Sequence, residues 1–167
     1  MPKNKDLPYR DCVGICVFNK NNQVWIGKRV SAAELENSPY CWQMPQGGID
    51  KGEEPLEAAI RELYEETSIK HVSLLQEASD WLYYDFPDDI VKAGKVGKYK
   101  GQRQRWFAFR FEGDEEEIEV ISPAKGKHPQ EFEDWRWGDL TTTPDLIVPF
   151  KRDVYEKVVA AFLNLVE

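Results

Sequence analysis

The sequence predicts an α/β domain in which a mixed β-sheet lies between helices. Strand-like runs occupy residues 12–18 and 23–29, before a central helical segment, and further strand-like runs follow at 72–86, 103–111 and 132–140. An amphipathic helical segment ends the chain. Strands on both sides of a central helix, with a second helix at the end, are typical of two helical layers around one sheet.

The N-terminal half is predicted to begin with a hairpin. The apolar runs 12–18 and 23–29 are joined by the polar residues 19–22, which favour a turn. Residues 31–40 are polar and are predicted to form a loop or a short helical turn. A short strand at 41–45 is predicted to follow.

The central helix is predicted from near Pro55 to about Thr67, after a loop led by Gly47 and Gly48. Proline suits the first turn of a helix, because its missing N–H would have no partner there. One face of this helix is expected to pack on the core, because apolar residues recur at helical spacing. Its members are Leu56, Ala59, Ile60 and Leu63.

Two later segments show regular apolar patterns. Residues 103–111 alternate, so one face of the strand carries Trp106, Ala108 and Arg110, and the other carries Phe107, Phe109 and Phe111. The last segment is predicted to be an amphipathic helix. Its apolar positions are Val154, Val158, Ala161, Phe162 and Leu165.

Length and composition indicate one globular domain spanning residues 1–167. A hydrophobic content of 41% with 13% aromatic residues is enough for a real core. We expect no membrane span and no signal peptide, because the chain has no long apolar run and its N-terminus is polar. Of the three cysteines, Cys12 and Cys16 fall in a strand-like run and are expected to be buried thiols, and a reducing cytoplasm is the expected compartment. Nothing in the sequence calls for an obligate protein partner.

The net charge of −8 is unevenly distributed. Residues 92–105 are rich in lysine and arginine and contain no acid, whereas residues 112–119 are mostly acidic. For the acidic block we favour a solvated surface. The basic segment has two readings of equal weight, a solvated loop or a surface that holds a polyanion.

Three glutamates of the central helix are expected to form one acidic face. Glu62, Glu65 and Glu66 stand at i, i+3 and i+4, so their carboxylates lie close together. Like charges at this spacing repel each other, unless a hard divalent cation binds them together with a substrate phosphate. A solvated acidic face is the alternative, but it explains neither the preceding glycines nor the position of Arg61.

The stretch from Gly47 to Ile69 resembles the Nudix box. That motif is Gly, five residues, Glu, seven residues, Arg-Glu-apolar-x-Glu-Glu-x-Gly-apolar, and this chain matches it through Gly47, Glu53, Arg61, Glu62, Leu63, Glu65, Glu66 and Ile69. Ser68 departs from it, because it stands where the family has a glycine. A glycine there would end the helix in a left-handed conformation, so we read the departure as a backbone matter that costs serine about 1 kcal/mol.

The resemblance implies a Nudix α/β/α sandwich and cleavage of a phosphoanhydride bond. Beyond the box, WQMPQGGID at residues 42–50, GQRQRWF at 101–107 and EFEDWRW at 131–137 resemble one subfamily. It groups bacterial RNA pyrophosphohydrolases with asymmetrical dinucleoside polyphosphate hydrolases. The expected substrate is therefore 5′-triphosphorylated RNA, which we favour, or a nucleotide polyphosphate such as diadenosine tetraphosphate.

The resemblance also assigns site residues. It implies two or three Mg²⁺ or Mn²⁺ ions held by Glu62, Glu65, Glu66 and Glu131 with Gly47, and a salt bridge from Arg61 to Glu53. Its substrate-facing positions are Arg10, Arg29, Gly48, Phe150, Lys151 and, more weakly, Tyr84. Phe150 has an alternative role as the apolar anchor of the last helix.

The reaction implied is an in-line attack of water on phosphorus, in which the protein supplies positioning and charge neutralisation. The proton acceptor stays open between Glu62, Glu65 and a carboxylate outside the box. A non-catalytic nucleotide-sensing module is the alternative of another class. Such a module would be expected to lack a box glutamate, and this chain retains all of them.

Overall fold

The fold was examined in a computed structural model that describes residues 7–30, 39–92 and 97–167. The loop or short helical turn predicted at residues 31–40 lies almost entirely outside the described residues. The strands are β1 (Tyr9–Phe18), β2 (Val24–Arg29), β3 (Trp42–Gln43), β4 (Gln46–Gly48), β5 (Val72–Glu77), β6 (Leu82–Asp85), β7 (Gly101–Phe111) and β8 (Phe132–Gly138). The helices are α1 (Pro55–Thr67), α2 (Asp88–Lys92), α3 (Pro123–Gly126), α4 (Thr143–Leu146) and α5 (Arg152–Phe162).

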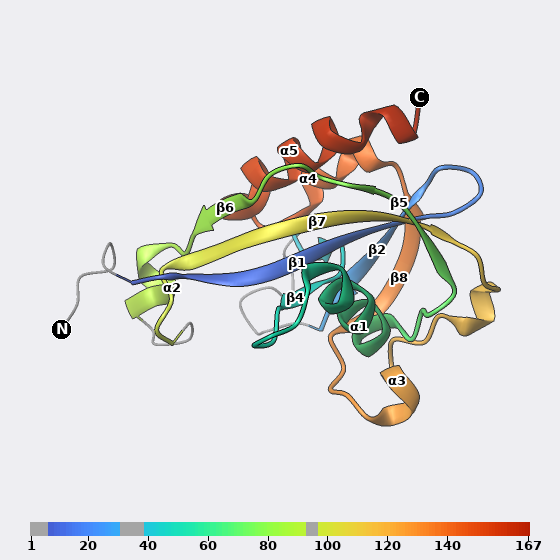
Figure 1. The fold of residues 1–167 in the computed structure, drawn as a ribbon, viewed down its shortest axis with the longest axis horizontal. Coiled ribbons are helices and arrows are strands. Elements are labelled where there is room, and N and C mark those ends of the chain that lie inside the picture. The colour runs from blue at the N-terminus through green and yellow to red at the C-terminus, as the bar shows by residue number, and fades with distance from the viewer. Residues whose placement is uncertain (1–6, 31–38, 93–96) are drawn as a thin grey trace.

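The described strands form one mixed eight-stranded sheet with the main order β3-β2-β1-β7-β5. Its centre is a long parallel pairing of β1 with β7, from Tyr9 opposite Gly101 to Phe18 opposite Arg110. The helices α1 and α5 cover opposite faces of this sheet (Figure 1). The predicted α/β arrangement with a mixed sheet between helices is therefore confirmed.

The core divides into two clusters, one on each face of the sheet. The alternation predicted for β7 is confirmed, since Trp106 and Ala108 pack on the α5 side and Phe107 and Phe109 on the α1 side. All four are buried, because helices cover both faces of the central strands. The predicted N-terminal hairpin and the C-terminal amphipathic helix are also present.

The acidic helix α1 runs from Pro55 to Thr67, as the sequence predicts. Its core face differs from the expected one at one position. Ala59 and Leu63 are buried, but Ile60 is 44% exposed and Ala58 is buried in its place. Both alanines pack into the core cluster between α1 and the sheet.

Gly47 and Gly48 were expected in a loop, but the structure places them in β4. Gly48 pairs with Cys12 and Gly47 with Val13 of β1 in antiparallel register. The strand is short and consists largely of glycine, so it carries none of the apolar alternation by which strands are recognised. This pairing fixes the residues before α1 to the centre of the sheet.

Ser68 ends α1 in the left-handed conformation, with φ of 67°, and its N–H donates to the Tyr64 carbonyl. The backbone interpretation of this position is therefore confirmed, but it is incomplete. The Ser68 hydroxyl donates to the Glu119 carbonyl at 3.0 Å and accepts from the Ala124 N–H at 2.9 Å. Serine thus ties the end of α1 to the segment that leads through α3.

Among the described residues, no helix combines the length and the apolar character needed to cross a membrane.

Candidate active site

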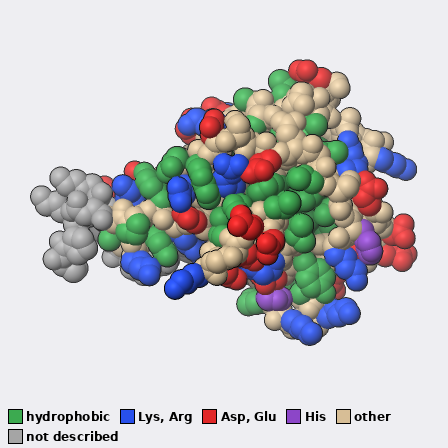
Figure 2. All heavy atoms as spheres, in the orientation of Figure 1, with side chains coloured by type: hydrophobic (Ala, Val, Ile, Leu, Met, Phe, Trp, Pro, Cys, Tyr) green, Lys and Arg blue, Asp and Glu red, His purple; other side chains and the backbone are tan. Residues whose placement is uncertain are grey.

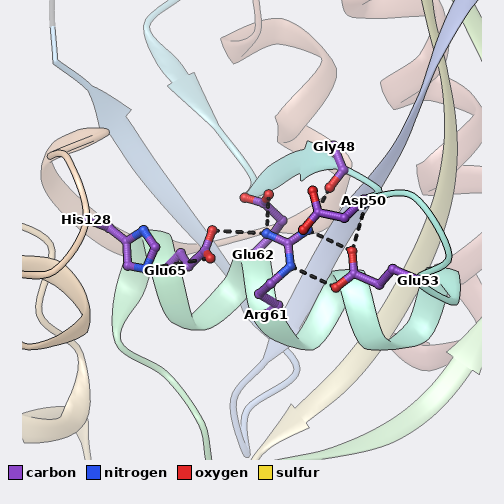
Figure 3. Close-up of polar contacts among 7 residues, drawn as sticks. All are labelled: Gly48, Asp50, Glu53, Arg61, Glu62, Glu65 and His128. Atoms are coloured by element: carbon purple, nitrogen blue, oxygen red, sulfur yellow. Dashed lines mark hydrogen bonds and ion pairs between the residues drawn. The ribbon is translucent and has the colours of Figure 1, made fainter.

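Arg61 is the centre of the polar network on α1 (Figure 3). Its Nε and one terminal nitrogen donate to the two oxygens of Glu53, each at 2.8 Å, and that terminal nitrogen also donates to the Gly48 carbonyl at 2.8 Å. This bidentate pair confirms the predicted salt bridge. The contact with Gly48 adds a link from α1 to β4, so one guanidinium positions both elements of the site.

The acidic face of α1 is partly neutralised by the same arginine. The remaining terminal nitrogen of Arg61 donates to Glu62 Oε1 at 2.8 Å and to Glu65 Oε2 at 3.1 Å. Asp50 approaches the guanidinium as well, at 3.6 Å. These contacts hold the pKa of Arg61 above its usual value, chiefly through its hydrogen bond with Glu53. Spacing alone did not predict them, because it gives the face of a residue but not the reach of a long side chain.

Glu66 is the most deeply buried carboxylate of the face, with 8% of its surface exposed. Its Oε2 atom has no hydrogen-bond partner among the described residues. Burial raises the pKa of Glu66 well above its usual value, and the nearby charges of Glu131 and Glu62 raise it further. Burial also raises the pKa of Glu62, against the opposing effect of Arg61. Carboxylates whose pKa is shifted by burial and by neighbouring charges are typical of functional sites.

Gly47 and Gly48 allow two charged side chains to approach β4. A Cβ atom at Gly47 would lie 2.2 Å from Oε2 of Glu62, and one at Gly48 would lie 2.4 Å from a terminal nitrogen of Arg10. Any larger residue would push these groups away. The glycines therefore place an acidic group on one side of β4 and a basic group on the other.

The acidic residues fit a hard divalent cation by their chemistry. Glu62, Glu65, Glu66 and Glu131 offer only carboxylate oxygens, which suit Mg²⁺ and Mn²⁺, and the orphaned oxygen of Glu66 has an unmet need for a positive partner. Within the described part of the chain, no three His, Cys, Asp or Glu side chains already converge as they would around an ion. Glu62 and Glu65 point to Arg61 instead, so holding an ion would require their carboxylates to turn.

Three of the predicted substrate residues lie together. Tyr84 is buried on the α5 side of β6, and its ring lies 5.7 Å from that of Phe150. The amino group of Lys151 lies 5.6 Å from the Tyr84 ring centre and 5.9 Å from that of Phe150. Phe150 also packs against the core cluster of α5, so the substrate and anchor interpretations both agree with its position.

Lys151 is a buried cation that lies near one other cation and two carboxylates. Burial lowers its pKa to about 8, and the charge of Arg29 acts in the same direction, whereas Glu66 and Glu131 oppose the shift. The structure therefore brings Lys151 and Arg29 near the acidic face. Arg10 is exposed and lies against Gly48.

Sequence reasoning assigned no chemistry to His128, which lies beside the site. Its Nε2 atom is 3.6 Å from Oε1 of Glu65, on the side of that carboxylate away from Arg61 (Figure 3). No motif marks this histidine, because it comes from the segment between α3 and β8, which only the fold brings to α1. The other histidine, His71, pairs with Glu117 elsewhere.

A mixed sheet between helices, with a carboxylate-rich helix on one side of a glycine strand and cations on the other, is suited to binding a phosphate-rich substrate. The chain belongs to the Nudix family, because the NUDIX domain model matches residues 8–158. It is 60% identical to an RNA pyrophosphohydrolase of Brucella anthropi over 97% of this chain and 94% of that protein. It is 59% identical to an RNA pyrophosphohydrolase of Agrobacterium fabrum over 98% of this chain and 96% of that protein.

Solved structures share the fold at low identity. A dihydroneopterin triphosphate pyrophosphohydrolase of E. coli superposes with a TM-score of 0.62 at 16% identity, over 92% of this chain and 98% of that one. An Ap4A hydrolase of C. elegans, solved as a binary complex, gives 0.59 at 18% identity, over 93% and 98%. These likenesses confirm the predicted Nudix fold.

Proposed function

We propose that this chain removes pyrophosphate from the 5′-triphosphate end of RNA and leaves a 5′-monophosphate. One observation carries the reaction class. The buried carboxylate of Glu66 has an unpartnered oxygen, and the buried Lys151 lies close enough for each charge to shift the pKa of the other. Carboxylates that suit a metal ion, next to a cation that suits phosphate, are what phosphoryl transfer requires.

The choice of RNA as substrate rests on the relatives. The Brucella anthropi and Agrobacterium fabrum proteins are RNA pyrophosphohydrolases, and each matches this chain over nearly its whole length. The three cysteines are buried and free, which agrees with work in the reducing cytoplasm, where RNA is found.

Glu62, Glu65, Glu66 and Glu131 would hold two or three Mg²⁺ or Mn²⁺ ions, with the Gly47 backbone beside them. When bound, these ions lower the pKa of the attacking water and stabilise the charge of the leaving oxygen. Arg61 has a positioning role, because it joins Glu53, Gly48 and the acidic face in one network.

The remaining site residues bind the substrate. Lys151, Arg29 and Arg10 neutralise the charge of the triphosphate, and the rings of Tyr84 and Phe150 contact a base. Water attacks in line, the bond between the α- and β-phosphates breaks, and pyrophosphate leaves. The proton of the water goes to Glu62, to Glu65 or to a carboxylate outside the box.

Asymmetrical cleavage of a dinucleoside polyphosphate is the second candidate. The Tyr84–Phe150 pair is compatible with it, because two adjacent rings suit an adenine in either substrate. A nucleotide-sensing module without catalysis is less well supported, since every glutamate of the box is present and Arg61 already orients two of them.

The proposal is tested with a 5′-triphosphorylated RNA oligonucleotide, by measuring released pyrophosphate and the 5′-monophosphorylated product. We expect turnover with Mg²⁺ or Mn²⁺ and none with a chelator. Glu65→Gln and Glu66→Gln should lower kcat by several orders of magnitude. Glu57→Gln is the matched control, because Glu57 is an exposed glutamate of the same helix. Full activity in chelator, or in the Glu66→Gln variant, would contradict the proposed reaction.

A further inference from the structure

The two neighbouring tyrosines of β6 face opposite sides of the sheet. Tyr84 is buried beside Phe150, whereas Tyr83 is 46% exposed on the side of α1. Trp81 precedes the strand and, at two residues from Tyr83, lies on the same side. The aromatic residues of this segment therefore form two groups, and only the Tyr84 group belongs to the site described above.

Trp81 is supported from below by two arginines of β7. The guanidinium carbon of Arg103 lies 4.2 Å from the Trp81 ring centre, and that of Arg105 lies 5.5 Å away. Both arginines lie on the same face of β7, because they are two residues apart in the strand, and Trp81 lies over that face. Arg103 is itself fixed by two hydrogen bonds to Asp11, at 2.6 and 3.1 Å. A partly exposed indole held by two cations is suited to stacking.

Tyr9 extends this group along the sheet. Its ring packs edge-on against Tyr83 at 5.1 Å, and its hydroxyl donates to Asp85 at 2.5 Å. The amino group of Lys100 lies 4.6 Å from the centre of the Tyr9 ring. We call Tyr9, Trp81, Tyr83 and Arg103 the aromatic platform. Figure 2 shows hydrophobic and cationic side chains interleaved on this part of the face, towards the left of the molecule.

The aromatic platform is connected to the candidate active site through adjacent strands. Asp11, which holds Arg103, accepts a hydrogen bond from the Ile49 N–H at 2.9 Å, directly after β4. The strands β4, β1, β7 and β6 are successive neighbours, since Cys12 pairs with Gly48, Asp11 with Arg103 and Arg103 with Tyr83. Three strand spacings span about 14 Å. A nucleic-acid chain of a few nucleotides can cover such a distance.

Charge alone does not account for this surface. Asp11 holds Arg103, Glu77 holds Arg105, and Asp85 binds Tyr9, so the acids offset much of the local positive charge. A polyanion attracted only by charge would gain little here. Aromatic rings on a cationic support are instead the arrangement that binds single-stranded nucleic acid by stacking, without sequence preference.

We propose that the aromatic platform binds bases of single-stranded RNA downstream of the triphosphorylated end, by stacking on Trp81 and Tyr83. This inference rests on the proposed function and adds a second contact region to it. A dinucleoside polyphosphate has one nucleoside at each end of the phosphate chain and lacks the run of successive bases that single-stranded RNA offers. The platform would therefore contribute to the preference for long RNA substrates.

The test compares Tyr83→Ala and Trp81→Ala with the ring-retaining Tyr83→Phe and Trp81→Phe. The substrates are a 5′-triphosphorylated dinucleotide and a longer unstructured 5′-triphosphorylated RNA. Each alanine variant should raise KM for the long RNA by about fivefold or more, as expected for one lost stack, with kcat unchanged. KM for the dinucleotide should not change, and the phenylalanine variants should retain most of the affinity. Leu74→Ala is a matched control, because Leu74 is 47% exposed on β5, outside the aromatic platform.

Two further measurements separate the possible failures. Thermal unfolding shows whether the alanine variants keep the fold, and a KM for long RNA that stays unchanged in folded variants would overturn the inference. If the wild-type protein hydrolyses no triphosphorylated RNA, the proposed function fails. The aromatic platform is then tested separately, by measuring binding of the same RNA without the triphosphate in fluorescence anisotropy. If only the alanine variants bind this RNA more weakly, the aromatic platform is supported. Equal binding by all variants overturns it.

Discussion

Replacing Glu66 with glutamine should raise stability while it removes activity. Glu66 is 8% exposed, and its Oε2 atom has no partner among the described residues. A buried polar group left unsatisfied costs about 1–3 kcal/mol. Glutamine has nearly the same shape without the charge, and its amide group can donate towards Glu62 and Glu131, whose charges already act on this position. We therefore expect a gain of about 1–3 kcal/mol in the free energy of unfolding at neutral pH.

The pH dependence of this gain follows from the direction of the pKa shift. Burial raises the pKa of Glu66, so the folded protein holds this proton more tightly than the unfolded chain does. Stability is then lost at this position as pH rises through the raised pKa. The advantage of Glu66→Gln should be present at neutral pH and disappear below about pH 4, near the pKa of an unfolded glutamate.

Thermal unfolding in chelator, followed by circular dichroism, measures the effect. For a domain of this size, each 1 kcal/mol shifts Tm by about 2–4 °C. Adding Mg²⁺ should raise the Tm of the wild-type protein by mass action and that of Glu66→Gln much less. Glu57→Gln should leave Tm unchanged in both buffers. A Glu66→Gln variant that is less stable than wild type in chelator at neutral pH would refute the claim that Glu66 carries an uncompensated buried charge.

Substitutions at three other positions test single features. Ser68→Ala should lower the free energy of unfolding in urea by about 1–3 kcal/mol, because both hydroxyl hydrogen bonds are lost. Ser68→Gly should cost about 1 kcal/mol less than Ser68→Ala, because glycine relieves the left-handed strain. A glycine variant more stable than the wild-type protein would contradict the role of the hydroxyl. As pH rises through about 8, where burial has placed the pKa of Lys151, KM for triphosphorylated RNA should rise, and Lys151→Arg should flatten that profile. Glu53→Gln should cost about 1–2 kcal/mol at neutral pH. Because Arg61 lowers the pKa of Glu53, this difference should vanish as pH falls below that lowered value, and a difference that persists in acid would contradict the role of the charge.

The sequence was informative wherever a local pattern determined the structure. Alternation in β7 predicted the faces of Trp106 and Phe107, because helices bury both sides of that strand. The spacing of the box glutamates predicted their common helix face. The Arg61–Glu53 pair came from the family resemblance, and the structure confirms it.

The remaining features depend on contacts between distant segments. His128 reaches Glu65 only because the segment between α3 and β8 folds against α1. The hydroxyl of Ser68 finds its partners more than fifty residues further along the chain. Tyr83 and Tyr84 are adjacent in β6, and the sequence does not reveal that the face of this strand around Tyr83 stays exposed.

The identity of the substrate is the central claim, and a comparison of turnover on the two candidate substrates tests it most directly. The measurement is kcat/KM with Mg²⁺ for 5′-triphosphorylated RNA and for diadenosine tetraphosphate, on the same preparation, with products identified by chromatography. We expect a clearly higher value for RNA, with pyrophosphate and 5′-monophosphorylated RNA as products. A higher value for diadenosine tetraphosphate, with ATP and AMP as products, would contradict it.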